Sequence, residues 1–279
     1  MYKYDLSRKT AVITGALGLL GPEWVLALLE SGAQVILTDL ADESEDTETR
    51  LDVLYRFCWE QAPSKNRPVY HKMDVTDEEQ IKAVATKYSP QILVNNAALD
   101  PKVSPTAGLS NSSRFEQLSL DFWHQGLAVT LDGTFLCCRI FGNQMIAAGK
   151  GGVIINIASE LASLAPDQRL YERPDVPLDQ QSVKPVTYMV AKAGVVALTK
   201  YLATYPSFLK AGIRINALSP SGVFNNHPAE FVNKLSSRIP MGRMANRDEY
   251  RGALQFLASD ASAYMNGQNL IMDGGKSVW

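Results

Sequence analysis

The stretch "TAVITGALGLLGPEWVLALLE" (residues 10–30) decides the fold. It begins with a run typical of a buried strand, passes through Gly15, Gly18 and Gly21, and ends in a segment with helical spacing. Glycines let a backbone turn tightly and approach a pyrophosphate, while a helix N-terminus offers free N–H groups. Pro22 fits the first helical turn, where no hydrogen bond is lost. The stretch predicts a nucleotide-binding unit, with an ordinary tight turn as the alternative.

Short apolar runs alternate with helix-like segments along the rest of the chain. Strands are expected at residues 10–14, 33–39, 68–74, 91–96, 152–159, 213–219 and 268–272. "TDEEQIKAV" predicts a helix start in which Thr76 caps and Glu79 reaches back. This alternation indicates the α/β class, with a doubly wound parallel sheet of about seven strands and helices on both faces. One domain over residues 1–279 accounts for the whole length.

The composition excludes several function classes. With 46% hydrophobic residues and a net charge of −2, the chain is typical of globular proteins and has no basic stripe for nucleic acid. No apolar run reaches the roughly 18 residues of a membrane span, and the N-terminus lacks a signal-peptide core. Three cysteines form no disulfide framework, so a cytoplasmic protein is expected. His71, His124 and His227 lack metal-ligand spacing, so no metal is expected.

Two aspartates at strand ends are candidate cofactor ligands. Asp39 ends the second expected strand at the distance from Gly21 where a carboxylate bonds the ribose hydroxyls of NAD. Residues 10–49 contain no Arg or Lys, and the acidic "ADESEDTE" would repel the extra phosphate of NADP, so NAD is expected. Asp74 can bond the adenine amino group while Val75 packs on the ring. The alternative for both aspartates is an ordinary turn at a strand end.

"YMVAK" (residues 188–192) places Tyr188 and Lys192 four positions apart in a helix-like segment. That spacing puts both side chains on one helix face. A tyrosine beside a cation can exchange a proton with a substrate, because the cation favours the ionised phenol. One such pair can arise by chance, so its meaning depends on the rest of the chain.

Six motifs fall in order along the chain. They are "TGALGLLG" (14–21), "NNAA" (95–98), "INIAS" (155–159), "YMVAK" (188–192), "RINALSPSGV" (214–223) and "MDGG" (272–275). Together they make the chain resemble the short-chain dehydrogenase/reductase family over about residues 8 to 275. The length favours the single-domain branch, although the G-x-x-G-x-x-G spacing is more typical of the two-domain branch. The resemblance implies a Rossmann fold and hydride transfer between nicotinamide and a secondary alcohol or ketone.

The resemblance also implies roles for individual residues. Tyr188 is the acid/base, Lys192 lowers its pKa and holds the nicotinamide ribose, and Ser159 orients the substrate oxygen. The implied cofactor contacts share positions in the glycine turn, at strand ends and on the catalytic helix. They are Gly15, Leu17, Gly18, Leu19, Leu20, Gly21, Asp39, Leu40, Asp74, Val75, Asn96, Ala97, Ala98, Tyr188, Lys192, Pro220, Gly222 and Val223.

Thr130 departs from the family pattern. In "VTLDGTF" (129–135) it occupies the place of the family's usual asparagine, which holds a water in the proton relay to the lysine. A threonine is shorter and donates differently. Our hypothesis is that Thr130 is catalytic and still supports a water.

Two polar segments are candidates for binding the substrate. Residues 160–186 form an insertion between Ser159 and Tyr188, and residues 220–247 form a loop that closes over the nicotinamide in the family. Their candidate substrate contacts are Glu160, Asp167, Arg169, Tyr171, Glu172, Asn225, Asn226 and His227. The alternative for the insertion is a surface elaboration or a subunit contact.

The overall pattern is similar to the dehydrogenases named for flagellin modification, which act in making nonulosonic or related amino sugars, with gluconate dehydrogenases as near neighbours. An NAD-dependent dehydrogenase for a sugar or amino-sugar derivative is therefore the leading hypothesis. The alternatives are a ketoreductase for an acyl or lipid-like substrate and a non-catalytic NAD-binding regulator. The helices expected to end near Gly149 and Lys210 resemble those of the family's four-helix contacts, which implies a homotetramer or homodimer.

Overall fold

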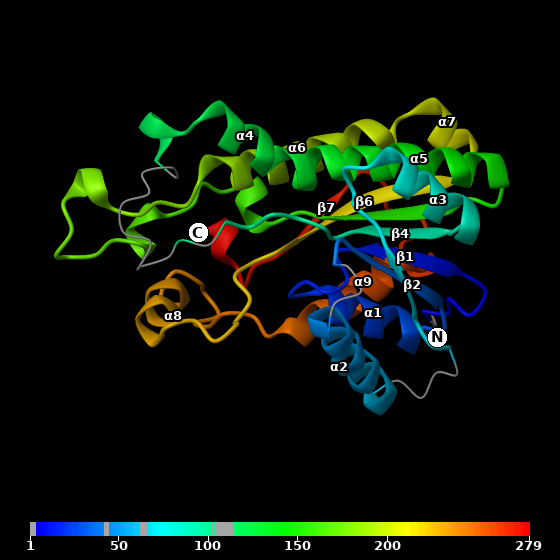
Figure 1. Ribbon diagram of the computed structural model, residues 1–279, viewed down its shortest axis with the longest axis horizontal. Coiled ribbons are helices and arrows are strands. Elements are labelled where there is room, and N and C mark those ends of the chain that lie inside the picture. Colours follow the sequence, from blue (N-terminus) through cyan, green and yellow to red (C-terminus); the bar gives the residue numbers. More distant parts are fainter. Residues whose placement is uncertain (1–3, 42–44, 62–65, 102, 104–113) are drawn as a thin grey trace.

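Seven parallel strands form one sheet in the order β3-β2-β1-β4-β5-β6-β7 in the computed structural model (Figure 1). The structure describes residues 4–41, 45–61, 66–101, 103 and 114–279. The strands are β1 (Thr10–Thr14), β2 (Gln34–Asp39), β3 (Val69–Lys72), β4 (Ile92–Asn95), β5 (Gly152–Ile157), β6 (Ile213–Pro220) and β7 (Asn269–Met272). Every expected strand is present, so the predicted doubly wound α/β fold is confirmed.

The side chains of the central strands alternate between two cores. Ala11 and Ile13 of β1 belong to the core on one face of the sheet, whereas Val12 between them belongs to the core on the other face. Val35 and Ile36 of β2 divide in the same way. This alternation follows from the two-residue period of a strand, and burial of both faces explains why the strands are continuously apolar.

Helices cover both faces of the sheet (Figure 1). One face carries α1 (Gly21–Glu30), α2 (Glu45–Gln61) and α9 (Arg251–Ala258). The other face carries α3 (Glu78–Tyr88), α4 (Leu120–Leu127), α5 (Gly133–Ala148), α6 (Val186–Ala203) and α7 (Pro206–Lys210). A π-helical turn, η3 (Ala128–Asp132), joins α4 to α5. Among the described residues, no helix is both long and apolar enough to cross a bilayer.

Short 3-10 helices and α8 (Ala229–Ser236) lie in the connections. The 3-10 helices are η2 (Phe115–Gln117), η4 (Glu160–Ala162), η5 (Gln168–Leu170), η6 (Leu178–Gln180), η7 (Arg247–Tyr250), η8 (Asp260–Ser262) and η9 (Lys276–Val278). The insertion that holds η5 and η6 and the loop that holds α8 both extend beyond the carboxyl ends of the strands (Figure 1). This end of the sheet, where the chain leaves β1 and β4 in opposite directions, is where open α/β sheets bind ligands.

Two local predictions are wrong. The cap of α3 is Asp77, whose carboxylate accepts the N–H groups of Glu79 and Gln80 at 2.9 and 3.2 Å, because Thr76 instead gives its N–H and hydroxyl to Asp74. The helix expected to end near Lys210 ends at Ala203. Its continuation is interrupted because Pro206 starts α7 and the residue before a proline prefers extended backbone.

Candidate active site

The three glycines of the first turn serve different purposes. A Cβ on Gly15 would lie 2.7 Å from the Cα of Ala97, and one on Gly21 would lie 2.1 Å from the carbonyl oxygen of Ala16. Both glycines are therefore required by the packing of the protein itself. A Cβ on Gly18 would meet only the carbonyl oxygen of Gly15, at 3.2 Å. A methyl group at residue 18 would need this carbonyl to move by only a few tenths of an ångström, so the packing of the protein constrains Gly18 much less than Gly15 and Gly21. A glycine there fits a backbone that a pyrophosphate approaches.

Asn96 holds this turn against the end of β4. Its amide nitrogen donates to the carbonyls of Thr14 and Gly15 at 3.2 and 2.8 Å, and its amide oxygen accepts the indole N–H of Trp24 at 2.8 Å. The Asn96 side chain is thus fully occupied within the protein. It positions the glycine turn, and only its backbone remains to line the cofactor as the sequence suggested.

Asp39 lies at the end of β2 beside the glycine turn. Its two carboxylate oxygens accept the N–H groups of Leu17 and Leu40, each at 2.9 Å. Arg50 of α2 returns to the same turn and donates to the carbonyl of Leu17. A cation therefore lies beside the predicted ribose site, although residues 10–49 contain none. This contact joins residues 33 positions apart, so the local sequence gave no sign of it.

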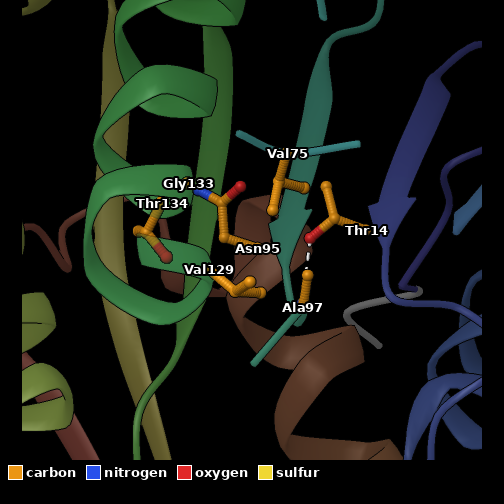
Figure 2. Close-up of a pocket in the computed structure, with 7 residues that line it drawn as sticks. All are labelled: Thr14, Val75, Asn95, Ala97, Val129, Gly133 and Thr134. Atoms are coloured by element: carbon orange, nitrogen blue, oxygen red, sulfur yellow. Dashed lines mark hydrogen bonds between the residues drawn. The ribbon is translucent and has the colours of Figure 1, made fainter. Parts of the chain in front are cut away.

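The remaining predicted cofactor contacts surround the same edge of the sheet. Leu19 and Leu40 expose much of their apolar side chains, whereas Leu17 and Val75 are buried. One carboxylate oxygen of Asp74 accepts the N–H and the hydroxyl of Thr76. Ala97 donates its N–H to the hydroxyl of Thr14 beside a narrow crevice without room for a water molecule (Figure 2). The crevice also holds the amide oxygen of Asn95, which has no hydrogen-bond partner among the residues that the structure describes. The others are Leu20 at the start of α1, Ala98 after β4, and Pro220, Gly222 and Val223 at the end of β6.

Ser159, Tyr188 and Lys192 come together from β5 and α6. The hydroxyl of Ser159 hydrogen-bonds to the phenol of Tyr188 and accepts the N–H of Leu161 at 3.2 Å. Lys192 is buried, and its ammonium group donates to the carbonyl of Ile157 at 2.6 Å. That ammonium group lies 5.8 Å from the centre of the Tyr188 ring. This arrangement can hold a substrate oxygen at the phenol and transfer its proton.

The pKa of the Tyr188 phenol depends on more groups than the neighbouring Lys192. Burial raises the pKa of Tyr188, and the carboxylates of Asp100 and Glu160 raise it further, whereas the Ser159 hydrogen bond lowers it. Burial also lowers the pKa of Lys192 to about 8, against a smaller opposing effect of Asp100. In the protein without its cofactor, burial and the two carboxylates therefore outweigh the groups that lower the pKa of Tyr188. The role of Lys192 in lowering that pKa beside a bound nicotinamide stays a prediction.

Thr130 is buried in the π-helical turn. Its hydroxyl accepts the N–H of Leu99 at 3.0 Å, and its carbonyl accepts the hydroxyl of Thr134 at 2.7 Å. The side chain thus ties the loop after β4 to the start of α5. The hydroxyl keeps its own proton for a further bond, and the proposed water there remains a prediction.

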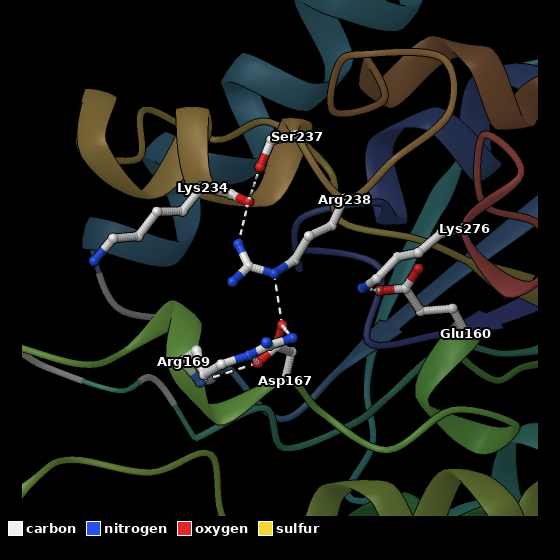
Figure 3. A network of polar contacts seen from close by, with 7 residues as sticks. All are labelled: Glu160, Asp167, Arg169, Lys234, Ser237, Arg238 and Lys276. Atoms are coloured by element: carbon white, nitrogen blue, oxygen red, sulfur yellow. Dashed lines mark hydrogen bonds and ion pairs between the residues drawn. The ribbon is translucent and has the colours of Figure 1, made fainter. Parts of the chain in front are cut away.

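Glu160 forms a buried ion pair beside Ser159 (Figure 3). One oxygen of its carboxylate accepts from Lys276 at 2.7 Å, and the other accepts from the hydroxyl of Ser221. A buried carboxylate is tolerated when both oxygens are paired in this way. Together with Ser221, the pair brings a residue after β5, one after β6 and one after β7 to the same end of the sheet.

The insertion is attached to α8 by a second polar network (Figure 3). Asp167 accepts from Arg238 at 2.6 Å and from Arg169 at 2.8 Å, and these bonds keep the pKa of Asp167 well below its usual value. Lys234 donates to the carbonyl of Glu172 at 3.3 Å. Asp167 and Arg169 therefore hold the insertion in place, and neither is among the groups that shift the pKa of Tyr188.

An aromatic row continues the contact between the insertion and α8. Tyr171 packs on Phe231 with ring centres 5.9 Å apart, and Phe231 stacks on His227 at 5.3 Å. Burial raises the pKa of Tyr171 to about 12, and Asp100 and Glu160 raise it too, so the Tyr171 phenol lies near both carboxylates. In the same loop, Arg247 binds the side chain of Asn225, and Asn226 adopts a left-handed backbone with φ of 50°.

Sequence reasoning missed several charged residues of this site. Asp100, Lys184 and Lys276 lie outside the quoted motifs, and their partners are distant in the chain. Lys184 precedes Tyr188 by four residues, which was the one available signal. Within the described part of the chain, no group of three or more His, Cys, Asp or Glu side chains is arranged to hold a metal ion.

Comparison with known proteins gives matches along the whole chain. A family model described as short chain dehydrogenase matches residues 9–170, and one described as enoyl-(acyl carrier protein) reductase matches residues 179–277. The chain is 32% identical to a D-threitol dehydrogenase of Mycolicibacterium smegmatis, with 99% of this chain and 96% of that protein covered. It is 28% identical to an NAD-dependent glycerol dehydrogenase of Listeria innocua over the same shares of the two chains.

Solved structures are similar over the same length. A short chain dehydrogenase from Leptospira borgpetersenii with bound NAD+ has a TM-score of 0.79 and 29% identity, covering 100% of this chain and 96% of that one. A gluconate 5-dehydrogenase from Burkholderia cenocepacia in complex with NADP and tartrate also has a TM-score of 0.79, with 28% identity, covering 99% of this chain and 98% of that one. Both nicotinamide cofactors therefore occur among similar structures.

Proposed function

This chain belongs to the short-chain dehydrogenase family, and we propose that it interconverts a secondary alcohol and a ketone on a sugar alcohol or sugar derivative, with NAD as its cofactor. The observation that carries the proposal is the meeting of Ser159, Tyr188 and Lys192 at the carboxyl end of the sheet. The glycine turn and Asp39 lie at the same end. A hydroxyl, a phenol and an ammonium group beside a dinucleotide site are suited to moving a proton and a hydride together.

In the oxidation direction, Tyr188 accepts the proton of the substrate hydroxyl while Ser159 holds the substrate oxygen. When bound, the oxidised nicotinamide supplies the acceptor for the hydride that leaves the carbinol carbon. Because burial raises the pKa of Tyr188, ionisation of the phenol depends on nearby positive charge. Lys192, fixed on the carbonyl of Ile157, supplies such a charge below a pH of about 8.

Asp39 supports NAD over NADP as the cofactor. A carboxylate at the end of β2 can accept the ribose hydroxyls of NAD and repels a 2′-phosphate. Arg50 is the opposing influence, because its guanidinium group lies across the glycine turn from this carboxylate. The ratio of kcat/KM for the two cofactors tests the preference, and equal or better use of NADP would contradict it.

The charged groups around Tyr188 support a polar substrate. Asp100 lies near the phenol and is more than half exposed, and the Tyr171 phenol lies near Asp100. These two side chains offer hydrogen-bonding groups to a neighbouring hydroxyl of the substrate, while the buried charge of Glu160 adds to the polarity of the site. The names of the similar threitol, glycerol and gluconate dehydrogenases point the same way. An amino-sugar substrate of the flagellin-modification type remains a narrower prediction. An acyl or lipid-like ketone fits these charges less well, despite the acyl-carrier name of the second family model.

NADH formation with a panel of polyols, sugars, amino sugars and nucleotide sugars tests the function. We expect turnover on at least one polyhydroxylated alcohol and its loss in Tyr188→Phe. Tyr264→Phe, at a fully exposed tyrosine, is the matched control and should be unchanged. Tight NADH binding without turnover on the panel or on acyl and lipid-like ketones would favour the non-catalytic regulator instead.

We also propose that the protein is a cytoplasmic homotetramer or homodimer. The oligomeric state rests on the family resemblance of the long helices α5 and α6, and the compartment rests on the free cysteines Cys58, Cys137 and Cys138. A solution mass measurement that gave only monomer would contradict it.

A further inference from the structure

Two lysines lie over the ring of Tyr188. Lys192 comes from the next turn of α6, with its ammonium group 5.8 Å from the ring centre. Lys184 comes from the end of the insertion, and its ammonium group is closer, at 4.7 Å. The Lys184 side chain is only 9% exposed, so this cation is held in the protein and does not extend into solvent.

Lys184 is fixed at both ends. Its ammonium group pairs with the carboxylate of Asp100 and donates to the carbonyl of Pro101 at 3.2 Å. Its backbone N–H donates to the side-chain oxygen of Gln168 at 2.9 Å, and the Gln168 side chain returns a bond to the Lys184 carbonyl at 3.2 Å. The loop after β4, the insertion and α6 therefore meet at this one side chain.

The charges that face Tyr188 come from four segments. Lys192 of α6 and Lys184 of the insertion are the cations, and Asp100 after β4 and Glu160 of η4 are the anions. Glu160 is already paired with Lys276 and Ser221. Asp100 is paired with Lys184, and its carboxylate is more than half exposed, which weakens its influence through solvent screening.

A cation on the face of a tyrosine favours the ionised ring. The neutral ring already attracts the ammonium group through its quadrupole. Ionisation adds a full negative charge to the same ring, so the attraction grows as the proton leaves. Because Lys184 is buried, this effect is screened less than it would be at the surface.

We propose that Lys184 is a positioning residue that acts through Tyr188: its ammonium group favours the phenolate that takes the substrate proton, and Asp100 holds and moderates that charge. The inference rests on the proposed dehydrogenase function. It gives the end of the insertion at Lys184 a role in proton transfer, in addition to covering the substrate. If Lys184 only held the insertion in place, its loss would lower kcat/KM equally at every pH. In the proposed role, its loss changes the pH at which the enzyme becomes active.

The experiment is the pH profile of kcat/KM for alcohol oxidation. Lys184→Met should move the rising limb up by about one pH unit, since an opposite charge at this distance shifts a pKa by roughly that much or more. Asp100→Asn should move the limb down, because the remaining cation is no longer paired. Lys184→Arg should keep the limb near its wild-type position. Lys87→Met is the matched control, because Lys87 lies 5.1 Å from the ring centre of Tyr88 in α3.

Distinct results would overturn the inference. A Lys184→Met profile lowered equally at every pH, with the limb unmoved, would show a purely structural role. If Lys184→Met fails to fold, an unmoved limb in Asp100→Asn has the same meaning. If wild type has no turnover on any alcohol, the proposed function fails separately. Phenolate absorbance of the NAD+ complex, taken as the difference from Tyr188→Phe, then still measures whether Lys184→Met and Asp100→Asn shift the pKa of Tyr188 in opposite directions.

Discussion

Alanine substitution should mainly lower stability at Gly21 and mainly weaken NADH binding at Gly18, although both glycines belong to the same motif. The new Cβ at residue 21 would lie 2.1 Å from the oxygen of Ala16, at least about 1 Å inside ordinary contact, and the obstructing atoms are backbone. Overpacking costs about 1–3 kcal/mol or more, and we expect the upper end here. For a chain of this size that lowers Tm by roughly 6–12 °C. Gly18→Ala should lower the unfolding free energy by about 1 kcal/mol or less, because the carbonyl of Gly15 must move by only a few tenths of an ångström. It should nevertheless weaken NADH binding about tenfold or more, because the methyl takes space at the pyrophosphate.

Thermal unfolding of the protein without cofactor and fluorescence titration with NADH separate the two effects. Gly252→Ala in α9 is the control, because its Cβ would meet no atom of the described residues within 4 Å and alanine is the better helix former. It should keep NADH affinity and raise Tm slightly. The reasoning would be refuted if Gly18→Ala lost as much Tm as Gly21→Ala, or if it bound NADH like wild type. The second result would place the pyrophosphate away from this turn.

Four further predictions concern charge. Asp39→Ser should raise the NADP/NAD ratio of kcat/KM about tenfold or more, because Arg50 then faces a 2′-phosphate without a competing carboxylate, and the double variant with Arg50→Ala should lose that gain. NADH affinity should fall as pH rises through about 8, where Lys192 loses its proton, and titrations of Lys192→Met should lack this step. Urea unfolding should show stability rising between pH 8 and 10.5, since unfolded lysine keeps its proton to 10.5. Arg238→Met should raise KM several-fold with little change in kcat, because it releases Asp167 of the insertion, whereas Lys82→Met, at an exposed ion pair, should change neither constant.

The fold was predictable because its determinants are local. The strands between the two edges of the sheet are short apolar runs whose burial on both faces leaves no polar alternation to misread. The edge strands β3 and β7 are less buried, yet the ends of all the strands were located within two residues. A helix cap was predicted wrongly where one side chain had several hydrogen-bond partners within reach. Thr76 could cap α3 by its position, but the carboxylate of Asp74 is nearer and takes both of its donors, which leaves the cap to Asp77. A residue pattern therefore gives the possible hydrogen-bond partners of a side chain, but it does not say which of them the side chain binds.

The site was predictable only as far as its motifs are contiguous. The glycine turn and the Tyr188–Lys192 pair are each written in one segment, and the structure places them at the same end of the sheet. Asn96 illustrates the limit, because its motif was expected to face the cofactor while its amide group in fact bonds Thr14, Gly15 and Trp24. The sequence shows that a polar residue stands at the end of a strand. The packing of the surrounding elements determines whether its side chain bonds within the protein or faces the cofactor.

The charges that set the proton affinity of Tyr188 are the least local feature of the protein. Lys184 and Asp100 are 84 residues apart, and Lys276 and Glu160 are 116 apart, so no window of sequence contains either pair. Each pair nonetheless lies near the same phenol because parallel strands deliver all their following loops to one edge of the sheet. The same geometry that makes the fold easy to predict therefore gathers distant, individually unremarkable charges around Tyr188. Substitutions in these four residues should change the pH dependence of the reaction while leaving the glycine turn and its affinity for NADH intact.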